Sequence, residues 1–223
     1  MALAASTKDC TSLSDTELVE MADLSAEREV SFDIGFVSKQ REEWVLVTQV
    51  RENNKLRGFS FCTLERIGGT PSLLVGLAAT DRTTKSESAL KAMMADQYRR
   101  ALLAFPDEDV LLGTRLLSAD GFRAFAKLID VVPRLDHRPS GEERAWARRL
   151  AKRFGAENRL DDRTFVTKGT GSLVGGFDFE SPKARVAPEL EAMFKSVNAA
   201  RGDRLVAFGW AMAEDLAAGR LGR

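Results

Sequence analysis

Apolar and β-branched residues gather in short runs between residues 30 and 78, in part at every second position, which is typical of β-strands. Residues 30–36 alternate in this way and predict the first strand. Three more strands are expected at 44–50, 56–67 and 72–78. The turns between these three are short and contain Asn-Asn or Gly-Gly, so we expect an antiparallel meander.

Helical patterns precede and follow this block of strands. Ser14 and Glu17 stand at the spacing of a capping box and predict a short helix, while residues 1–13 are expected to be disordered. After the strands, an apolar stripe with a period of 3.6 predicts a long helix over 85–105. A further helix is expected over 121–129.

Residues 110–116 are apolar on both faces and predict a central strand. A helix of about 20 residues separates this strand from the one at 72–78, which is the spacing that a parallel crossover requires. The two strands are therefore expected to lie parallel in one sheet.

The chain changes character at the polar, turn-rich stretch 136–141. This stretch divides the chain into a core of residues 14–135 and a C-terminal α/β extension of residues 136–223. The extension contains an amphipathic helix at 142–154 and many large apolar side chains, including Trp146. Because such side chains need a common core, we expect the extension to pack on residues 14–135.

Composition narrows the class of protein. Lys+Arg and Asp+Glu both number 33, and a neutral total weighs against nucleic acid or an acidic membrane as the main partner. With one histidine, and with Cys10 and Cys62 far apart, no metal site is expected. The sequence has no apolar stretch of signal-peptide or membrane-span length, so we expect a cytoplasmic protein.

The start of the long helix carries the clearest candidate ligand site. The first turn of a helix offers unpaired N–H groups and the positive end of its dipole, which attract phosphate. Arg82 and Lys85 add positive charge there, and Thr84, Ser86 and Ser88 add hydroxyl donors. The alternative is that these hydroxyls only cap the helix, as every helix start requires.

The order of elements over residues 31–133 resembles the core of the GNAT acyltransferase superfamily. Two stretches carry the resemblance: the strand, loop and helix at 73–102, and Val-Leu-Leu-Gly-Thr-Arg-Leu at 110–116 followed by Gly-Phe-Arg-Ala-Phe-Ala-Lys-Leu. It implies an α/β fold with a mixed, largely antiparallel central sheet and helices on both faces. In that family the strands before and after the long helix splay apart, and acyl-CoA enters the split.

The resemblance also implies ligands and partners. The cofactor would be acetyl-CoA or another acyl-CoA, with its thioester held near Val75 and Gly76 and its pyrophosphate at the start of the long helix. The acceptor would be an amine, and a homo-oligomer is left open. No catalytic residue is carried over.

Three features depart from the family pattern. The loop 81–88 lacks glycine, and Asp81 and Glu87 place negative charge beside the proposed anion site. The span 36–44 is too short for the helical pair that the family has between its first two strands. The helix after the fifth strand lacks the tyrosine that often serves as general acid, and the sole tyrosine, Tyr98, lies in the preceding helix.

Four single side chains invite a chemical role beside a plainer one. Cys62 is a potential nucleophile, although a small apolar strand residue is the plainer interpretation. Asp33 and Glu65 would suit a general base if their strands faced a cleft, but solvent-facing strand positions commonly carry such residues. His137 would suit a proton shuttle, and its turn-rich surroundings favour a surface loop.

Two longer motifs are weaker signals. The Arg-rich stretch 144–153 offers charge for phosphates of nucleic acid, but Glu142 and Glu143 favour a solvated helix face. The glycine-rich run 169–176, which includes Ser172, lacks the GxxxxGK[ST] pattern of a phosphate loop.

Three functions therefore stay open. The leading hypothesis is a GNAT-like protein that binds an acyl-CoA or a related pantetheine thioester, for transfer of the acyl group to an amine. The second is a non-catalytic GNAT-fold protein that acts through protein–protein contacts. The third is a nucleic-acid-associated module that uses the helix at 144–153. One observation bears most on the first two hypotheses: whether the strands at 72–79 and 110–116 diverge around an open slot.

Overall fold

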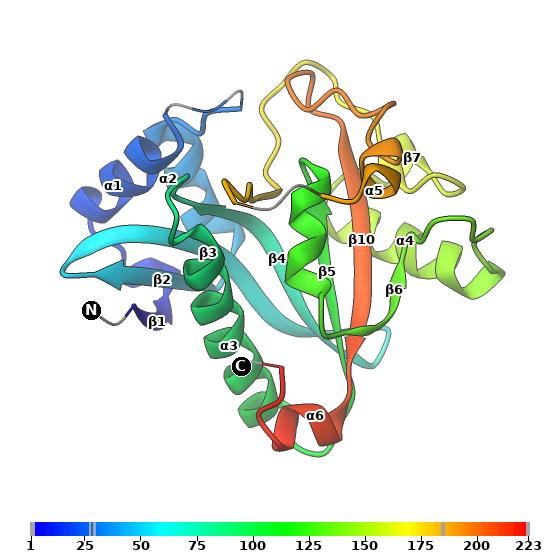
Figure 1. Ribbon diagram of the computed structural model, residues 1–223, viewed down its shortest axis with the longest axis horizontal. Helices are drawn as coiled ribbons and strands as arrows, with labels where there is room; N and C mark the ends of the chain where they lie inside the picture. The colour runs from blue at the N-terminus through cyan, green and yellow to red at the C-terminus, as the bar shows by residue number, and fades with distance from the viewer. Residues whose placement is uncertain (1–2, 27, 29, 184–185, 222–223) are drawn as a thin grey trace.

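The computed structural model describes residues 3–26, 28, 30–183 and 186–221, and the strands of these ranges form one sheet (Figure 1). Its order is β1-β2-β3-β4-β9-β5-β10-β8-β7, and β6 pairs with β10. The strands are β1 Ala4–Asp9, β2 Leu46–Glu52, β3 Lys55–Ile67, β4 Thr70–Thr80, β5 Val110–Leu116, β6 Ile129–Val132, β7 Leu160–Asp161, β8 Val166–Thr167, β9 Phe177–Asp178 and β10 Arg204–Ala211.

Helices cover both faces of this sheet. In Figure 1, α3 and η2 lie on the near face and α4 lies on the far face. The α-helices are α1 Asp15–Ser25, α2 Ile34–Glu43, α3 Ser86–Ala104, α4 Gly141–Arg153, α5 Pro188–Ala192 and α6 Ala213–Ala217. The 3₁₀ helices are η1 Cys10–Ser12, η2 Ala119–Phe125 and η3 Glu157–Arg159. The mixed α/β fold with a largely antiparallel sheet is thus confirmed.

The predicted meander is present in β2, β3 and β4, which pair antiparallel in sequence order. Its turns need left-handed backbone, and Asn53 and Asn54 have φ of 48° and 65°. Gly68 and Gly69 supply positive φ at the next turn. The parallel pairing of β4 with β5, from Ser72↔Leu111 to Val75↔Thr114, is also confirmed.

The first strand predicted from the sequence, at 30–36, is wrong. Asp33 ends the extended segment by accepting a hydrogen bond from the Phe36 N–H at 2.7 Å, which caps α2. Phe32 is buried, but Ile34 is 46% exposed, so the alternation does not mark one buried strand face.

Residues 1–13 were expected to be disordered, whereas Ala4–Asp9 form β1 in the structure. This strand pairs antiparallel with β2, from Ala4↔Arg51 to Asp9↔Leu46. Its small polar residues gave no hydrophobic signal, because it is an edge strand held by its main chain. As a result, the helical pair α1 and α2 lies between the first two strands, although 36–44 alone was too short for one.

The helix expected over 121–129 is only in part helical. The segment forms the 3₁₀ helix η2, in which the Gly121 N–H bonds to the Ser118 carbonyl at 3.2 Å. The chain then straightens into β6, where Val132 pairs with Phe208 of β10. Pairing with the sheet edge therefore overrides the helical periodicity of this stretch.

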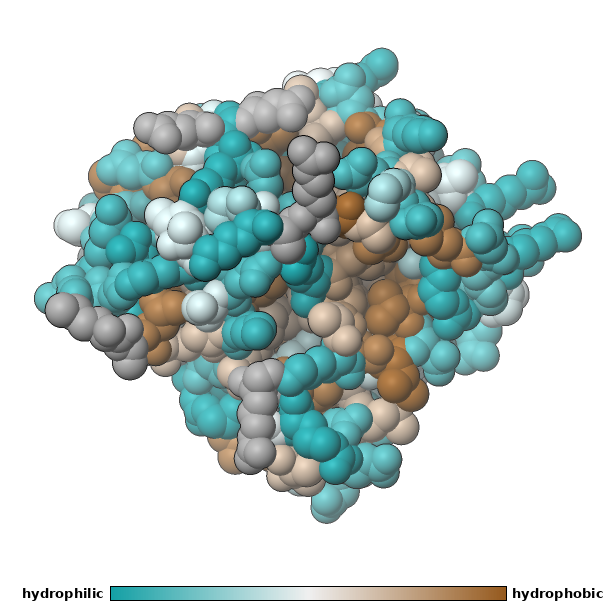
Figure 2. All heavy atoms as spheres, viewed as in Figure 1, coloured by the Kyte–Doolittle hydropathy of each residue, from teal (hydrophilic) through white to brown (hydrophobic). Residues whose placement is uncertain are grey.

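The C-terminal part of the chain completes the same sheet. β10 pairs antiparallel with β5 along its length, from Leu205↔Leu116 to Ala211↔Val110, and α4 packs on β10. The domain boundary at 136–141 stays a prediction. On the face shown in Figure 2, hydrophilic side chains dominate, apart from an apolar patch to the right of the centre. Ile129 of β6 is 44% exposed.

No helix within the described ranges has both the length and the apolar character of a membrane span.

Glu17 joins three elements at the N-terminal edge of the sheet. Its carboxylate accepts hydrogen bonds from Lys8 of β1 at 2.7 Å, from Gln49 of β2 at 2.8 Å and from the Ser14 N–H at 2.8 Å. The last contact, with Ser14 Oγ accepting from the Glu17 N–H, completes the predicted capping box. Burial opposes ionisation, but the hydrogen bonds from Lys8, Ser14 and Gln49 outweigh it and lower the pKa of Glu17 to about 2.

We predict that Glu17→Gln lowers the free energy of unfolding at pH 7 by about 1–3 kcal/mol. Because the folded-state pKa lies below the ordinary value of 4.5, the carboxylate contributes its full stability above that value and loses it as pH falls toward 2. The difference between wild type and Glu17→Gln should therefore shrink between pH 5 and pH 2. Urea unfolding at several pH values measures it, with the exposed Glu42→Gln as control. A difference that is constant with pH would contradict the assignment.

Candidate functional site: the split between β4 and β5

The strands β4 and β5 separate after four parallel residue pairs, and β9 fills the gap between them. Beyond Val75, β4 pairs with β9 instead, at Ala78↔Phe177 and Ala79↔Asp178. On the other side of the gap, Leu116 of β5 also pairs with Phe177. The strands thus diverge as in the predicted family, but residues 175–179, which we call the plug segment, occupy the split.

The plug segment satisfies main-chain groups on both sides of the split. The Ala78 N–H donates to the Gly176 carbonyl at 3.0 Å, and the Leu117 N–H donates to the Phe177 carbonyl at 3.3 Å. Phe177 and Phe179 are almost fully buried. Since buried main-chain groups without partners are costly, the plug segment stabilises β4 and β5 in their diverged arrangement.

Two glycines allow the plug segment to pass through the narrowest point. A Cβ on Gly175 would lie 2.8 Å from the carbonyl oxygen of Gly76, and one on Gly176 would lie 2.7 Å from that of Arg115. Because both obstacles are backbone atoms, neither can move aside as a flexible side chain would. The glycine-rich run 169–176 therefore leads into a tightly packed crossing, which its weak likeness to a phosphate loop did not reveal.

Buried arginines hold the plug segment from two sides. Arg28 forms an ion pair with Asp178 and donates to the Thr80 carbonyl, and the side chains of Arg28 and Asp178 are only 3% and 10% exposed. At the base of the plug segment, Arg204 donates to the Gly175 carbonyl at 3.4 Å and to the carbonyl of Val174, the residue before the segment. Burial lowers the pKa of Arg204 to about 10.

Arg115 is a buried cation beside the point where the strands part. Its guanidinium lies over the Phe154 ring, 4.6 Å from the centroid, and its closest acceptors are the carbonyls of Phe154 and Gly76 at 3.4 and 3.5 Å. Burial, together with the charge of Arg204, lowers the pKa of Arg115 to about 9. Sequence reasoning missed this residue, although a charged residue within a strand that is apolar on both faces was a usable signal.

The two adjacent residues predicted to hold a thioester, Val75 and Gly76, lie in different surroundings. Val75 lies inside the sheet, paired with Cys62 and Thr114, and its carbonyl accepts from Thr114 Oγ1 at 2.7 Å. Gly76 is the extra residue of a bulge and lies at the start of the split. A Cβ on Gly76 would fall 1.8 Å from the Trp44 ring, so a larger residue does not fit there.

At the start of α3, the predicted cations face carboxylates of the chain itself. Arg82 pairs with Glu180 at 2.7 Å, and Lys85 pairs with Glu52. Each of these two cations is therefore already paired with a carboxylate of the chain.

The predicted hydroxyl donors of this turn are dispersed. Thr84 and Ser88 are exposed, and the buried Ser86 Oγ has no hydrogen-bond partner among the described residues. The main-chain N–H of Ser86 is already used by the Thr83 carbonyl at 3.0 Å. The anion site predicted from Arg82, Thr84, Lys85, Ser86 and Ser88 stays a prediction.

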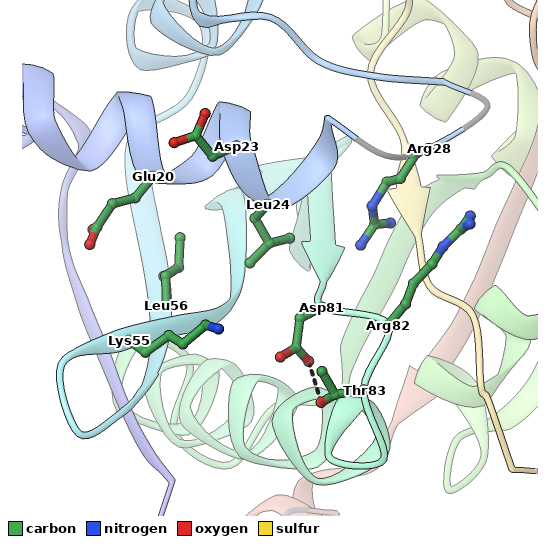
Figure 3. Close-up of a pocket in the computed structure, with 9 residues that line it drawn as sticks. All are labelled: Glu20, Asp23, Leu24, Arg28, Lys55, Leu56, Asp81, Arg82 and Thr83. Carbon is green, nitrogen blue, oxygen red and sulfur yellow. Dashed lines mark hydrogen bonds between the residues drawn. The ribbon is translucent and has the colours of Figure 1, made fainter.

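Two cavities flank the plug segment, and both are lined in part by Arg28 and Arg82. The first has a volume of about 460 Å³ and lies between the C-terminal half of α1, the start of β3 and the loop 81–83 (Figure 3). Figure 3 shows Arg28 and Arg82 at one end of this cavity and Glu20 and Lys55 at the other. The second, of about 340 Å³, lies on the side of Ser118 and Glu180.

The remaining side chains singled out in the sequence have structural roles. Asp33 caps α2, Glu65 pairs with Arg153 at 2.7 Å, and His137 bonds to Glu143 at 2.8 Å.

Two buried groups are unsuited to acid–base or nucleophilic chemistry. Burial raises the pKa of Cys62 to about 12, which keeps its thiol protonated and unreactive. Burial also raises the pKa of Tyr98, whose hydroxyl donates to the Ala124 carbonyl at 3.3 Å.

We predict that Asp178→Asn loosens the plug segment. Removing one partner of a buried ion pair costs about 3–5 kcal/mol, because the other charge stays buried. Amide hydrogen exchange at Ala78 and Leu117 should then speed up at least tenfold, while exchange at Val75, inside the sheet, stays slow. Asp162→Asn, which breaks a more exposed pair with Arg148, is the control. Unchanged exchange at Ala78 and Leu117 would show that the ion pair does not hold the plug segment.

No family model and no curated protein matches this sequence. Several solved structures are similar in fold at low identity. A ribosomal-protein alanine N-acetyltransferase from Escherichia coli has 12% identity and a TM-score of 0.43, over 62% of this chain and 86% of that one. The protein TTHA1254 from Thermus thermophilus has 13% identity and a TM-score of 0.34, over 48% and 74%.

A third structure is a probable N-acyltransferase of unknown function from Enterococcus faecalis. It has 13% identity and a TM-score of 0.35, and the match covers 95% of this chain but 53% of that one. The element order itself agrees with the resemblance seen in the sequence: a helical pair after the first strand, an antiparallel meander, a long helix and a strand parallel to β4. The element order that the resemblance implies is therefore present, and it begins at β1 rather than at residue 31.

Proposed function

We propose that this chain binds an acyl-CoA, or a related pantetheine thioester, in the split between β4 and β5 after the plug segment has left it. The observation that carries this proposal is that the split accepts an extended main chain that hydrogen-bonds to both strands. The Ala78 and Leu117 N–H groups are the donors used by the plug segment. A pantetheine arm is also extended and carries two amides, so its carbonyls can accept from the same donors.

The reaction that such binding would serve is acyl transfer to an amine. The amine nitrogen attacks the thioester carbonyl, the C–S bond breaks, and the CoA thiolate leaves. Water takes the proton from the amine, and the thiolate is protonated by solvent. A preorganised main-chain N–H near Gly76 would stabilise the developing oxyanion. Cys62 and Tyr98 take no part, because both are buried and protonated.

A second candidate is a non-catalytic GNAT-fold protein in which the split stays closed. The buried Arg28–Asp178 ion pair favours it, because opening the split would separate these charges. The pairing of Arg82 with Glu180 and of Lys85 with Glu52 favours it too, since these contacts compete with a pyrophosphate.

Calorimetric titration with acetyl-CoA separates the two candidates. If the plug segment competes with the ligand, Asp178→Asn should bind acetyl-CoA at least tenfold more tightly than wild type, because more of the protein is then open. Replacing Arg82 and Lys85 together by Ala should weaken binding by about 1.5–3 kcal/mol for each charge-assisted hydrogen bond lost. Arg66→Ala, which removes an exposed arginine paired with Glu108, is the matched control and should bind as wild type does.

Each outcome of this titration favours one candidate. Absence of heat with both wild type and Asp178→Asn at millimolar ligand would reject acyl-CoA binding and leave the non-catalytic candidate. Equal affinity of wild type and the Arg82/Lys85 variant would show that the pyrophosphate does not lie at the start of α3.

A further inference from the structure

A further cavity lies away from the split, at the outer end of α4. It has a volume of about 430 Å³ and is lined by His137, Arg138, Pro139, Arg144 and Arg163. These residues form what we call the arginine pocket. They come from the loop after β6, from the first turn of α4 and from the turn between β7 and β8.

The three arginines of this pocket have no carboxylate partner among the described residues. No side-chain hydrogen bond or ion pair within those ranges involves Arg138, Arg144 or Arg163. The Nε of Arg144 is moreover buried without a hydrogen-bond acceptor. Convergence of three like charges is unfavourable unless an anion offsets it.

Of the carboxylates near the pocket in sequence, three have other partners, while Asp136 and Glu142 are exposed and do not line the pocket. Glu143 accepts from His137, from Arg134 at 2.7 Å and from the Ser140 N–H. Asp161 accepts from the N–H groups of its own turn, at Arg163 and Thr164, and the charge of Arg163 also helps to lower the pKa of Asp161.

The third nearby carboxylate, Asp162, pairs with Arg148. No acidic residue lines the pocket itself in the part of the chain that the structure describes. Among the described residues, Arg134 and Arg148 thus form ion pairs with carboxylates, and the arginines of the pocket form none.

We propose that the arginine pocket binds a small molecule that carries a diphosphate group. Planar guanidinium groups pair with phosphate oxygens through two parallel hydrogen bonds, and three of them match the charge and the many acceptors of a diphosphate. The cavity is larger than one phosphate requires, which leaves room for the second. This assignment does not depend on the split between β4 and β5, or on acyl-CoA binding there.

The rest of α4 argues for a small ligand rather than for nucleic acid. A nucleic-acid surface needs a continuous run of free cations along the helix. Here Arg148 is paired with Asp162, and Arg153 is paired with Glu65. The Arg149 guanidinium lies over the Trp146 ring, 4.8 Å from its centroid. Of the arginines of α4, Arg144 alone has neither an ion pair nor an aromatic ring among the described residues, and it lies at the pocket.

Calorimetric titration with inorganic pyrophosphate at low ionic strength tests the proposal. Wild type should bind, and Arg144→Gln should weaken binding at least tenfold. Arg163→Gln should do the same, and since Arg163 is exposed, its loss does not endanger the fold. Arg148→Gln, on the same helix but paired outside the pocket, is the matched control and should bind as wild type does. The Arg82/Lys85 double alanine variant should also keep its affinity, because its cations belong to the split.

Three results would overturn the proposal. One is the absence of pyrophosphate binding to wild type at millimolar concentration. Another is equal affinity in wild type, Arg144→Gln and Arg163→Gln. The third is a single-stranded oligonucleotide that binds more tightly than pyrophosphate and with the same dependence on Arg144, which would assign the pocket to nucleic acid.

Discussion

Every main-chain group in the interior of a sheet needs a hydrogen-bond partner, and this requirement governs the centre of the molecule. β4 and β5 pair for only four residues and then part, which would leave the N–H groups of Ala78 and Leu117 without acceptors. The chain supplies those acceptors from residues 175–179, about sixty residues beyond β5. Gly175 and Gly176 let that segment pass, and the Arg28–Asp178 pair and the Gly175 carbonyl bound by Arg204 keep it in place.

The same requirement means that the split can accept either the plug segment or another extended molecule. A gap that accepts one extended strand with hydrogen bonds on both sides can accept another extended molecule of similar chemistry. Under the proposed function, a ligand and the plug segment would compete for the same donors, and interactions outside the gap would set the balance. Arg28 and Arg82 line the cavities on both sides of the plug segment, so the charges that secure it also border the space around it.

The sequence predicted those elements that carry their own local signal. The meander follows from alternation and from Asn-Asn and Gly-Gly turns, α3 from its apolar stripe, and α4 from its amphipathic pattern, with Ser140 and Glu143 completing a capping box. The elements that were missed depend on distant partners. β1 is polar and becomes a strand only by pairing with β2, while β9 is two residues long and is defined by the gap that it fills.

The candidate site was harder to predict for the same reason. Arg82 and Lys85 were found from their place at a helix start, but their partners Glu180 and Glu52 are remote in sequence. Arg115 was hidden in a strand that otherwise looked apolar. Charge pairing and burial are properties of tertiary structure, so local patterns indicate where ionisable groups stand but not which groups neutralise them.

The position of β5 in the chain has a consequence for biosynthesis. Its edge partner Leu205 lies far along the sequence, and residues 133–203 must be synthesised before β10 can reach it. As the chain emerges from the ribosome, β5 is therefore an apolar strand with one unpaired edge until β10 has been added. Such late, non-local pairing slows folding and exposes an edge to neighbouring chains. The apolar edge of β5 is thus covered only after residues 204–211 have been made.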